Sequence, residues 1–301
     1  MRADRAAVAF VEGADWSDGW SERVRSVVEP LIGRGTRRDA LTGRWMGHPA
    51  HPMIVMVPMT CWIGATAVDL IGGRGAERIA RKLVGAGVVA ALPAAATGAA
   101  DWLDTEGAER RIGVAHALAN NVATIAFSGS WLARRAGRRP LGGVLSSVGV
   151  AALGVSGFLG GHLAYTRGVG VNTTAFQSGP VEWTPLCSIN RLEADLVQIK
   201  LGAVAFAVVR RVDRFDVVED RCTHRGAPLS EGRIVHDCIE CPWHGSRFAT
   251  ETGAVRAGPA SIPQPAYETR VREGILEIRR IEHGGLRRNP VGASAAVTDN
   301  D

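Results

Sequence analysis

The chain has 301 residues, of which 46% are hydrophobic and 22% are charged, and its formal net charge at pH 7 is +5. This length allows two domains that each bury a core, and the composition excludes a disordered or collagen-like chain. Five cysteines are too few, and odd in number, for a small secreted scaffold held together by disulfides.

Charged residues are distributed unevenly along the chain. Residues 45–166 contain 16 Asp, Glu, Lys and Arg among 122 residues, whereas residues 167–301 contain 34 among 135. Four uncharged segments of 18 to 27 residues interrupt the first region, and a helix needs roughly 20 apolar residues to cross a bilayer. They are Trp45–Val68, Leu83–Ala100, Ile112–Ala133 and Pro140–Thr166. The pattern predicts four transmembrane helices; the alternative is a soluble bundle of buried Ala- and Gly-rich helices.

Two segments flank the parts that we expect to fold into domains. Residues 1–44 come first, and apolar residues recur at helical spacing from Val24 to Leu31, which predicts a short amphipathic helix. Residues 282–301 lack periodicity and are rich in Gly, Ala, Asn and Asp, so we expect them to form a disordered tail.

The strongest chemical signal is a pair of Cys–His motifs in the second half of the chain. Cys222-Thr-His224 is followed, after 16 residues, by Cys241-Pro-Trp-His244. Two thiolates and two imidazoles suit a zinc ion. They also suit a Rieske centre, in which two Cys bind one iron of a [2Fe-2S] cluster and two His bind the other. The order and spacing favour the Rieske centre, and alternating apolar residues predict β-strands around it.

Roughly residues 181–281 resemble the Rieske [2Fe-2S] family, and in particular the Rieske-type ferredoxins of bacterial oxygenase systems. The resemblance rests on Cys241-Pro-Trp-His-Gly-Ser-Arg-Phe248, Thr252-Gly253 and Gly258-Pro259. It implies an all-β domain that holds the cluster through four ligands, with three further residues beside it. The implied ligands are Cys222, His224, Cys241 and His244, and the neighbouring residues are Trp243, Gly245 and Ser246.

The motif departs from that of the Rieske proteins of cytochrome bc complexes. Those proteins carry a further Cys in each loop, joined by a disulfide, whereas this chain has Ala227 and Trp243 at the two positions. Phe248 stands where the high-potential branch has a hydrogen-bonding Tyr, although Ser246 remains as a donor. Fewer donors stabilise the reduced cluster less, so we expect a low-to-intermediate potential within the Rieske range of about −150 to +300 mV.

Four histidines give the membrane region a weaker signal. His48 and His51 open the first segment, His116 lies near the start of the third, and His162 lies near the end of the fourth. An up-down-up-down bundle places all four at one membrane face, the face from which the C-terminal domain emerges. Two imidazoles can hold a b-type haem, with His116 and His162 as the first pair and His51 as the alternative, and several can hold a metal ion. The other interpretation is that each imidazole only hydrogen-bonds to neighbouring helices.

Roughly residues 30–170 resemble a bacterial membrane family known as domain of unknown function 2231. The resemblance rests on Gly47-His-Pro-Ala-His-Pro52, Ala115-His116-Ala117 and the Gly160–Gly170 segment. It implies a four-helix integral membrane module without established chemistry. The expected fold is therefore multidomain, with an N-terminal all-α four-helix transmembrane bundle and a C-terminal all-β Rieske domain.

These observations predict five consecutive regions. They are an N-terminal segment at 1–44, a transmembrane domain at 45–166, a linker at 167–182, a Rieske domain at 183–281 and a tail at 282–301. Only 55 residues follow Ser246, which is too few for the mononuclear iron domain of an oxygenase. We therefore expect an electron carrier or an oxidoreductase component rather than an enzyme that acts alone.

The expected function is that of a ferredoxin-like one-electron carrier anchored in the cell membrane. Its partners would be the lipid bilayer and a reductase or oxygenase-type protein, and no nucleic acid, because no basic stripe with aromatic residues is present. One alternative is an oxidoreductase subunit that passes electrons between the cluster and a haem, a metal or a quinone at the membrane histidines. Another is a redox or iron sensor.

The sequence barely indicates how the protein is oriented in the membrane. Eight basic residues flank one end of the predicted helices and seven flank the other, so the positive-inside rule does not decide. The denser basic loops favour the outer side for the C-terminal domain, whereas the missing disulfide of the Rieske loops favours the cytoplasmic side, which we expect.

Overall fold

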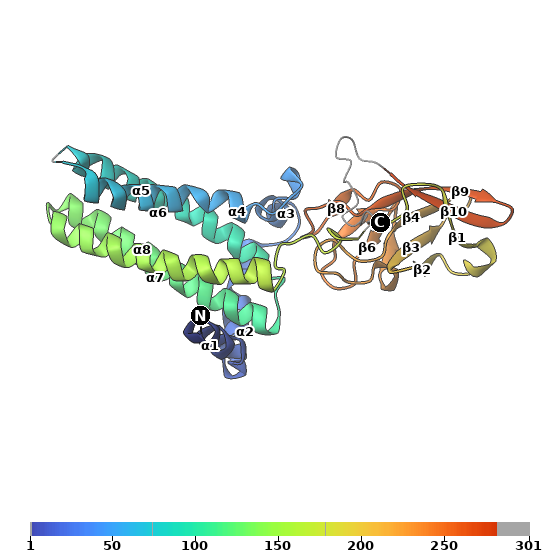
Figure 1. The fold of residues 1–301 in the computed structure, drawn as a ribbon, viewed down its shortest axis with the longest axis horizontal. Coiled ribbons are helices and arrows are strands. Elements are labelled where there is room, and N and C mark those ends of the chain that lie inside the picture. Colours follow the sequence, from blue (N-terminus) through green and yellow to red (C-terminus); the bar gives the residue numbers. More distant parts are fainter. Residues whose placement is uncertain (1, 74, 178, 282–301) are drawn as a thin grey trace, which may run out of the picture.

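The computed structural model describes residues 2–73, 75–177 and 179–281. A helical module and a β domain lie end to end in an elongated molecule, and they meet at a narrow junction (Figure 1). The multidomain α-plus-β fold expected from the sequence is thereby confirmed. The tail predicted at 282–301 lies outside the described residues.

Four long helices form two antiparallel hairpins in the helical module (Figure 1). Trp62 stacks on Phe127 with ring centroids 4.5 Å apart. A Cβ at Gly87 would lie 2.4 Å from Trp62, and one at Gly149 would lie 2.5 Å from Phe127. Glycines therefore let two aromatic rings join all four helices. The elements are α4 (His51–Ile54), α5 (Met56–Ile71), α6 (Ala76–Trp102), α7 (Gly107–Arg135), α8 (Arg139–Gly161) and a terminal turn, His162–Thr166.

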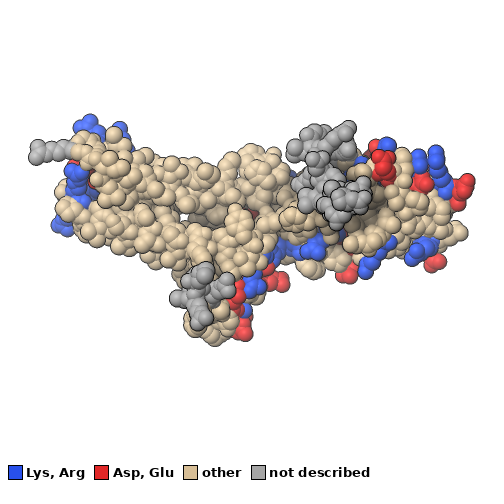
Figure 2. Space-filling view, viewed as in Figure 1, with Lys and Arg blue, Asp and Glu red and all other residues tan. Residues whose placement is uncertain are grey.

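The outward surface of these helices is largely apolar. In the described ranges, three helical stretches are long and apolar enough to cross a membrane: His51–Ile71, Ala76–Trp102 and Arg139–Thr166. The fourth predicted span, on α7, does not reach that hydropathy, yet Leu118 and Ile125 on it are 51% and 71% exposed. Figure 2 shows a long uncharged stretch between a basic far end and the charged β domain. A bilayer would cover an apolar surface of this kind.

Three shorter helices precede the bundle: α1 (Arg2–Glu12), α2 (Asp18–Ile32) and α3 (Thr36–Thr42). The predicted amphipathic helix corresponds to α2, whereas the sequence analysis missed α1. Val8 of α1 is buried against Ile112 and Leu159 of the bundle. Glu12, at the end of α1, accepts hydrogen bonds from Arg167 and His162 at 2.9 Å each. The N-terminal segment thus packs against the end of the bundle that lies nearest the β domain.

The β domain consists of two antiparallel sheets, with the strand orders β1-β10-β9-β4-β3-β2 and β5-β6-β7-β8. The apolar alternation predicted for strands falls on β2, β4, β9 and β10. The first Cys–His motif follows β4, and the second lies in the turn between β6 and β7. The strands are β1 (Thr184–Ser188), β2 (Leu196–Leu201), β3 (Val204–Arg210), β4 (Phe215–Glu219), β5 (Arg233–Val235), β6 (Cys238–Glu240), β7 (Arg247–Ala249), β8 (Val255–Ala257), β9 (Ala266–Arg272) and β10 (Ile275–Arg280).

Arg134 lies inside the helical module. It is one of the eight basic residues counted at one end of the predicted helices, but it does not lie at the basic surface there. Its side chain is 0% exposed, and its guanidinium pairs with both carboxylate oxygens of Asp69. Ser130 and Ser146 take further contacts with the guanidinium. This ion pair ties α5, α7 and α8 together. Without Arg134, the count of basic residues is seven at each end.

The Asp69–Arg134 pair should be needed for stability. Asp69→Asn leaves Arg134 buried without a counter-charge, so we expect the free energy of unfolding to fall by about 3–5 kcal/mol. Thermal unfolding in detergent measures the change. Arg138→Ala, at an exposed arginine four residues along the chain, is the matched control. Equal unfolding temperatures for the two variants would contradict this account of the pair.

Candidate iron–sulfur site

Two loops with the same backbone hydrogen bonds carry the Cys–His motifs. In the first loop, the Cys222 N–H donates to the Ala227 carbonyl, and the Gly226 N–H donates back to the Cys222 carbonyl, each at 2.8 Å. In the second loop, the Cys241 N–H donates to the Ser246 carbonyl at 2.8 Å, and the Gly245 N–H donates to the Cys241 carbonyl at 3.1 Å. The shared geometry presents one sulfur and one imidazole from each loop.

Glycine is required at the fifth position of each loop. Gly226 has φ 80° and Gly245 has φ 70°, which is the left-handed region that other residues rarely adopt.

The two cysteine sulfurs lie together beneath the surface. Cys222 and Cys241 are 1% and 3% exposed, and neither forms a disulfide. The neighbouring Cys222 thiol lowers the pKa of Cys241 to about 7, with help from the N–H groups of Trp243 and His244. The contact with the Cys241 thiol raises the pKa of Cys222, and burial of Cys222 raises this pKa further. Backbone N–H groups directed at sulfur stabilise thiolates, which are the form that binds iron.

The two imidazoles also face one another across the loops. The rings of His224 and His244 have centroids 5.1 Å apart and lie nearly perpendicular. Burial lowers both of their pKa values, that of His224 to about 3, so both rings are neutral and able to ligate metal. The Nδ1 atoms of both rings are buried and have no hydrogen-bond partner. Buried polar atoms of this kind require a partner, which a bound metal would supply.

The donor set fits a [2Fe-2S] cluster better than it fits zinc. Tetrahedral zinc needs its ligands to gather around one point. Within the described ranges, no three His, Cys, Asp or Glu side chains gather in that way. A Rieske cluster instead takes two ligands on each of two irons, and the cysteine pair and the histidine pair match this division.

Ser246 supplies a further polar group in the second loop. It is fully buried, and its Oγ accepts the Ala260 N–H at 3.0 Å, which leaves the hydroxyl proton free for an acceptor such as cluster sulfur. A Cβ at Gly258 would lie 2.5 Å from the Ser246 Cα, so only glycine lets the two chain segments approach this closely. Phe248 is fully buried in the apolar core of the domain.

The β domain presents its first Cys–His loop to the helical module. The Nε2 of His224 lies 3.6 Å from an oxygen of Asp104, which follows α6. The other oxygen of Asp104 accepts a hydrogen bond from Arg38 at 2.5 Å. Beside this contact, Arg225 pairs with Glu109 of α7. The side chain of His224 is only 16% exposed, because acidic groups of the helical module cover it.

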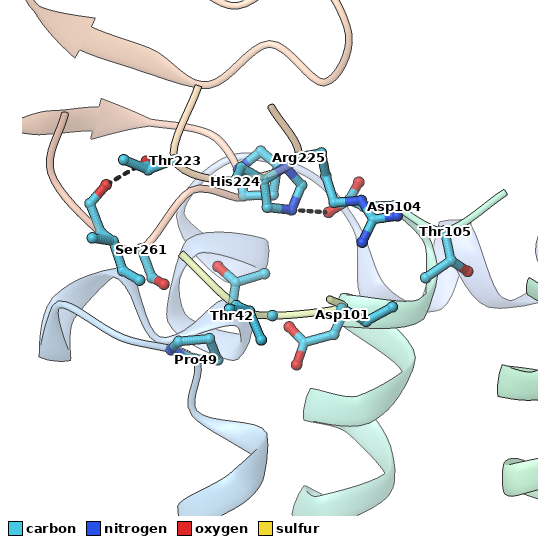
Figure 3. Close-up of a pocket in the computed structure, with 14 residues that line it drawn as sticks. Thr42, Pro49, Asp101, Asp104, Thr105, Thr223, His224, Arg225 and Ser261 are labelled. Atoms are coloured by element: carbon cyan, nitrogen blue, oxygen red, sulfur yellow. Dashed lines mark hydrogen bonds and ion pairs between the residues drawn. The ribbon is translucent and has the colours of Figure 1, made fainter. Parts of the chain in front are cut away.

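A pocket separates the two modules at this point (Figure 3). Thr42, Pro49 and Asp101 line it from the helical module, and His224 and Ser261 line it from the β domain. On the second loop, Trp243 is 58% exposed and remains accessible.

The structure separates the four membrane histidines into two groups. His51 and His116 face one another, with ring centroids 6.5 Å apart. His48 is exposed and contacts the carbonyl of its neighbour Pro49. His162 bonds to Glu12 at 2.9 Å, so the expected His116–His162 pair is not formed, because the unpredicted helix α1 supplies a carboxylate to His162.

The residues that hold the two modules together were not predicted from the sequence. Asp101, Asp104, Glu106 and Glu109 form an acidic segment between the second and third membrane segments. Counting helices places that loop on the same side as the Cys–His domain. This signal was available in the sequence, but the partners Arg38 and Arg225 could be assigned only from the fold.

Comparisons with known proteins agree with this geometry. The Rieske [2Fe-2S] domain family matches residues 182–268, and the family described as "Predicted membrane protein (DUF2231)" matches residues 47–173. The chain is 37% identical over 94 residues to ferredoxin CarAc of Metapseudomonas resinovorans, a stretch that covers 31% of this chain and 88% of that protein. It is 34% identical over 98 residues to the anthranilate 1,2-dioxygenase ferredoxin subunit of Burkholderia cepacia, which covers 32% of this chain and 91% of that protein.

Among solved structures, the Sphingomonas yanoikuyae B1 ferredoxin aligns with 30% identity and a TM-score of 0.31, over 33% of this chain and 98% of that one. By its matches to the two family models and its similarity to ferredoxin CarAc, the chain belongs to the Rieske [2Fe-2S] family, with a DUF2231 membrane-protein domain preceding its Rieske domain. The Rieske domain binds a [2Fe-2S] cluster and transfers electrons.

Removal of the Ser246 hydroxyl should lower the midpoint potential of the cluster. A neutral hydrogen bond contributes about 1 kcal/mol, which corresponds to about 40 mV for a one-electron couple. Ser246→Ala should therefore shift a redox titration downward by about 40 mV, because the reduced cluster loses a donor. Ser261→Ala, which changes a serine on the pocket wall, should leave the potential within about 10 mV. An unchanged potential in Ser246→Ala would show that the hydroxyl does not reach the cluster.

Proposed function

We propose that this protein is a membrane-anchored Rieske ferredoxin that carries single electrons at low-to-intermediate potential. The observation that carries the proposal is the pair of equivalent loops, which bring two buried thiols and two unpartnered imidazole Nδ1 atoms together. Similarity to ferredoxins of bacterial dioxygenase systems supports a carrier role. The buried Phe248 and the missing loop disulfide support a potential below that of the high-potential branch.

Each ligand has a separate role in this proposal. Cys222 and Cys241 would hold one iron as thiolates, and the N–H donors near them would offset the negative charge of the sulfurs. His224 and His244 would hold the other iron through Nδ1. Trp243, Gly245 and Ser246 shape and shield the second loop. The bound cluster supplies one-electron redox chemistry, while the protein fixes its position and potential.

Anchoring in the cell membrane is supported by the apolar outer face of the bundle. Three helical stretches in the described part of the chain are long and apolar enough to cross a bilayer, and the exposed leucines, isoleucines and valines of α7 extend that face. A soluble partner of the reductase or oxygenase type would reach the cluster beside Trp243, the exposed flank of the second loop.

A second candidate function is that of an oxidoreductase subunit that passes electrons to a redox group in its own membrane module. The contact between His224 and Asp104 favours it. A cluster that exchanged electrons only with soluble partners would not need one of its histidine ligands to contact the helical module.

We propose the cytoplasmic side for the Rieske domain. All five cysteines are free, and the domain lacks the loop disulfide of the bc-type proteins, as suits a reducing compartment. The basic residues do not oppose this orientation, since each end of the bundle carries seven.

Loss of any one of the four ligands should abolish the cluster. Cys222→Ser, His224→Ala, Cys241→Ser and His244→Ala should each remove the EPR signal of the reduced protein, because an iron loses one of its two protein donors. Cys238→Ser is the matched control, since Cys238 forms a C-x-x-C with Cys241 but belongs to β6 and should keep the signal. A signal that survives in a ligand variant, or disappears in Cys238→Ser, would contradict the assignment.

Sidedness can be tested by labelling intact cells with a membrane-impermeant maleimide. Arg138→Cys puts a thiol in the exposed turn between α7 and α8, and Val212→Cys puts one at a fully exposed position of the Rieske domain. We expect only Arg138→Cys to react above the unsubstituted protein, and both to react after lysis. The opposite pattern would place the Rieske domain outside.

A further inference from the structure

We propose that His51 and His116 are the two axial ligands of a b-type haem in the helical module, and that this haem exchanges single electrons with the cluster. The electron exchange rests on the proposed function, whereas haem binding does not. The residues that carry the inference lie on α4 and α7, away from the Cys–His loops.

The two rings have the separation that a shared iron requires. Their centroids lie 6.5 Å apart and their planes are inclined by 84°. A metal–nitrogen bond of about 2.0–2.1 Å, with about 1.1 Å from nitrogen to ring centre, puts two axial imidazole centroids about 6.3 Å apart. Perpendicular ring planes are compatible with axial ligation, because each imidazole turns independently about its iron–nitrogen bond.

Hydrogen bonds orient both imidazoles for ligation. The Nδ1 of His51 lies 3.0 Å from the Ala94 carbonyl, and the Nδ1 of His116 lies 2.9 Å from the Ser156 carbonyl. A carbonyl accepts only from a protonated nitrogen, so each ring carries its proton on Nδ1 and keeps a lone pair on Nε2. This is the usual support for a metal-bound histidine. The Asn120 amide donates to the Nε2 of His116 at 3.0 Å. Haem iron would replace this amide as the partner of Nε2.

The surroundings suit haem better than a bare metal ion. A bare ion needs at least one more protein ligand, and no group of three His, Cys, Asp or Glu occurs in the described ranges. A porphyrin supplies four nitrogens, and two imidazoles then complete six-coordinate iron. The rings also pack against helix backbone, because a Cβ at Gly98 would lie 2.8 Å from His51 and one at Gly160 would lie 3.1 Å from His116.

His51 lies close to the junction with the cluster. Pro49, two residues before His51, lines the same pocket as His224 (Figure 3). Thr97 approaches the Nδ1 of His51 at 3.3 Å, and Asp101, one turn further along α6, also lines that pocket. His224 therefore lines this small pocket from the β domain, and residues close to His51 line it from the helical module.

The exchange needs no additional reactant. One electron leaves the reduced cluster, whose ferrous iron becomes ferric, and the ferric haem iron becomes ferrous. The reverse transfer obeys the same balance. No bond is broken in either direction.

Haem binding can be measured on the full-length protein purified in detergent, incubated with hemin and desalted. We expect a Soret band and about one haem per protein by the pyridine haemochrome assay, with the low-spin EPR signal of bis-histidine haem. His51→Ala and His116→Ala should each reduce the bound haem at least tenfold. His48→Ala and His162→Ala, at the other two histidines of this region, are matched controls and should retain it.

The EPR signal of the reduced cluster serves as the folding control in every variant. If haem is absent from the unsubstituted protein although the cluster is present, the haem proposal is wrong and the carrier function stands. If the cluster is absent while haem is bound, the carrier function fails instead. Equal haem content in His116→Ala and His162→Ala would also overturn the ligand assignment.

Discussion

The convergence of two loops with one backbone geometry is the constraint on which the site depends. Each loop is closed by the same pair of hydrogen bonds between a cysteine and the residues four and five positions later. Each needs a glycine with positive φ to do so. The first loop follows a strand of the six-stranded sheet and the second joins two strands of the four-stranded sheet, so the packing of the two sheets brings the four donors together. The buried Nδ1 atoms of His224 and His244 have no hydrogen-bond partner within the described protein, and a bound metal would supply one.

The position of the β domain follows from charge at its junction with the bundle. Arg225 faces Glu109, and Arg38 holds Asp104 beside His224. One histidine edge of the site is thereby turned toward the membrane module, while Trp243 keeps the flank of the other loop exposed. The carrier that we propose therefore has one flank covered by its own chain and one flank open to a separate protein.

Much of this organisation could be predicted from the sequence. Charge-free segments predicted the long helices, and the spacing of Cys222, His224, Cys241 and His244 predicted two neighbouring loops. Both signals are local, since they depend on periodicity and on motif spacing. The sequence could not place Arg134, which reads as one more loop arginine until Asp69 of another helix is brought against it. The sequence also did not predict α1, and therefore not the carboxylate of Glu12, which hydrogen-bonds to His162. Such errors concern long-range contacts, which a linear pattern does not encode.

The central claim is that two histidine nitrogens bind the iron of a cluster in this protein. Hyperfine EPR spectroscopy of the reduced full-length protein, grown with 14N- or 15N-histidine in a histidine-requiring host, measures this directly. The account predicts two strongly coupled nitrogens whose couplings change with the isotope. A cluster without coupled histidine nitrogens, or a metal centre that gives no EPR signal on reduction, would contradict it.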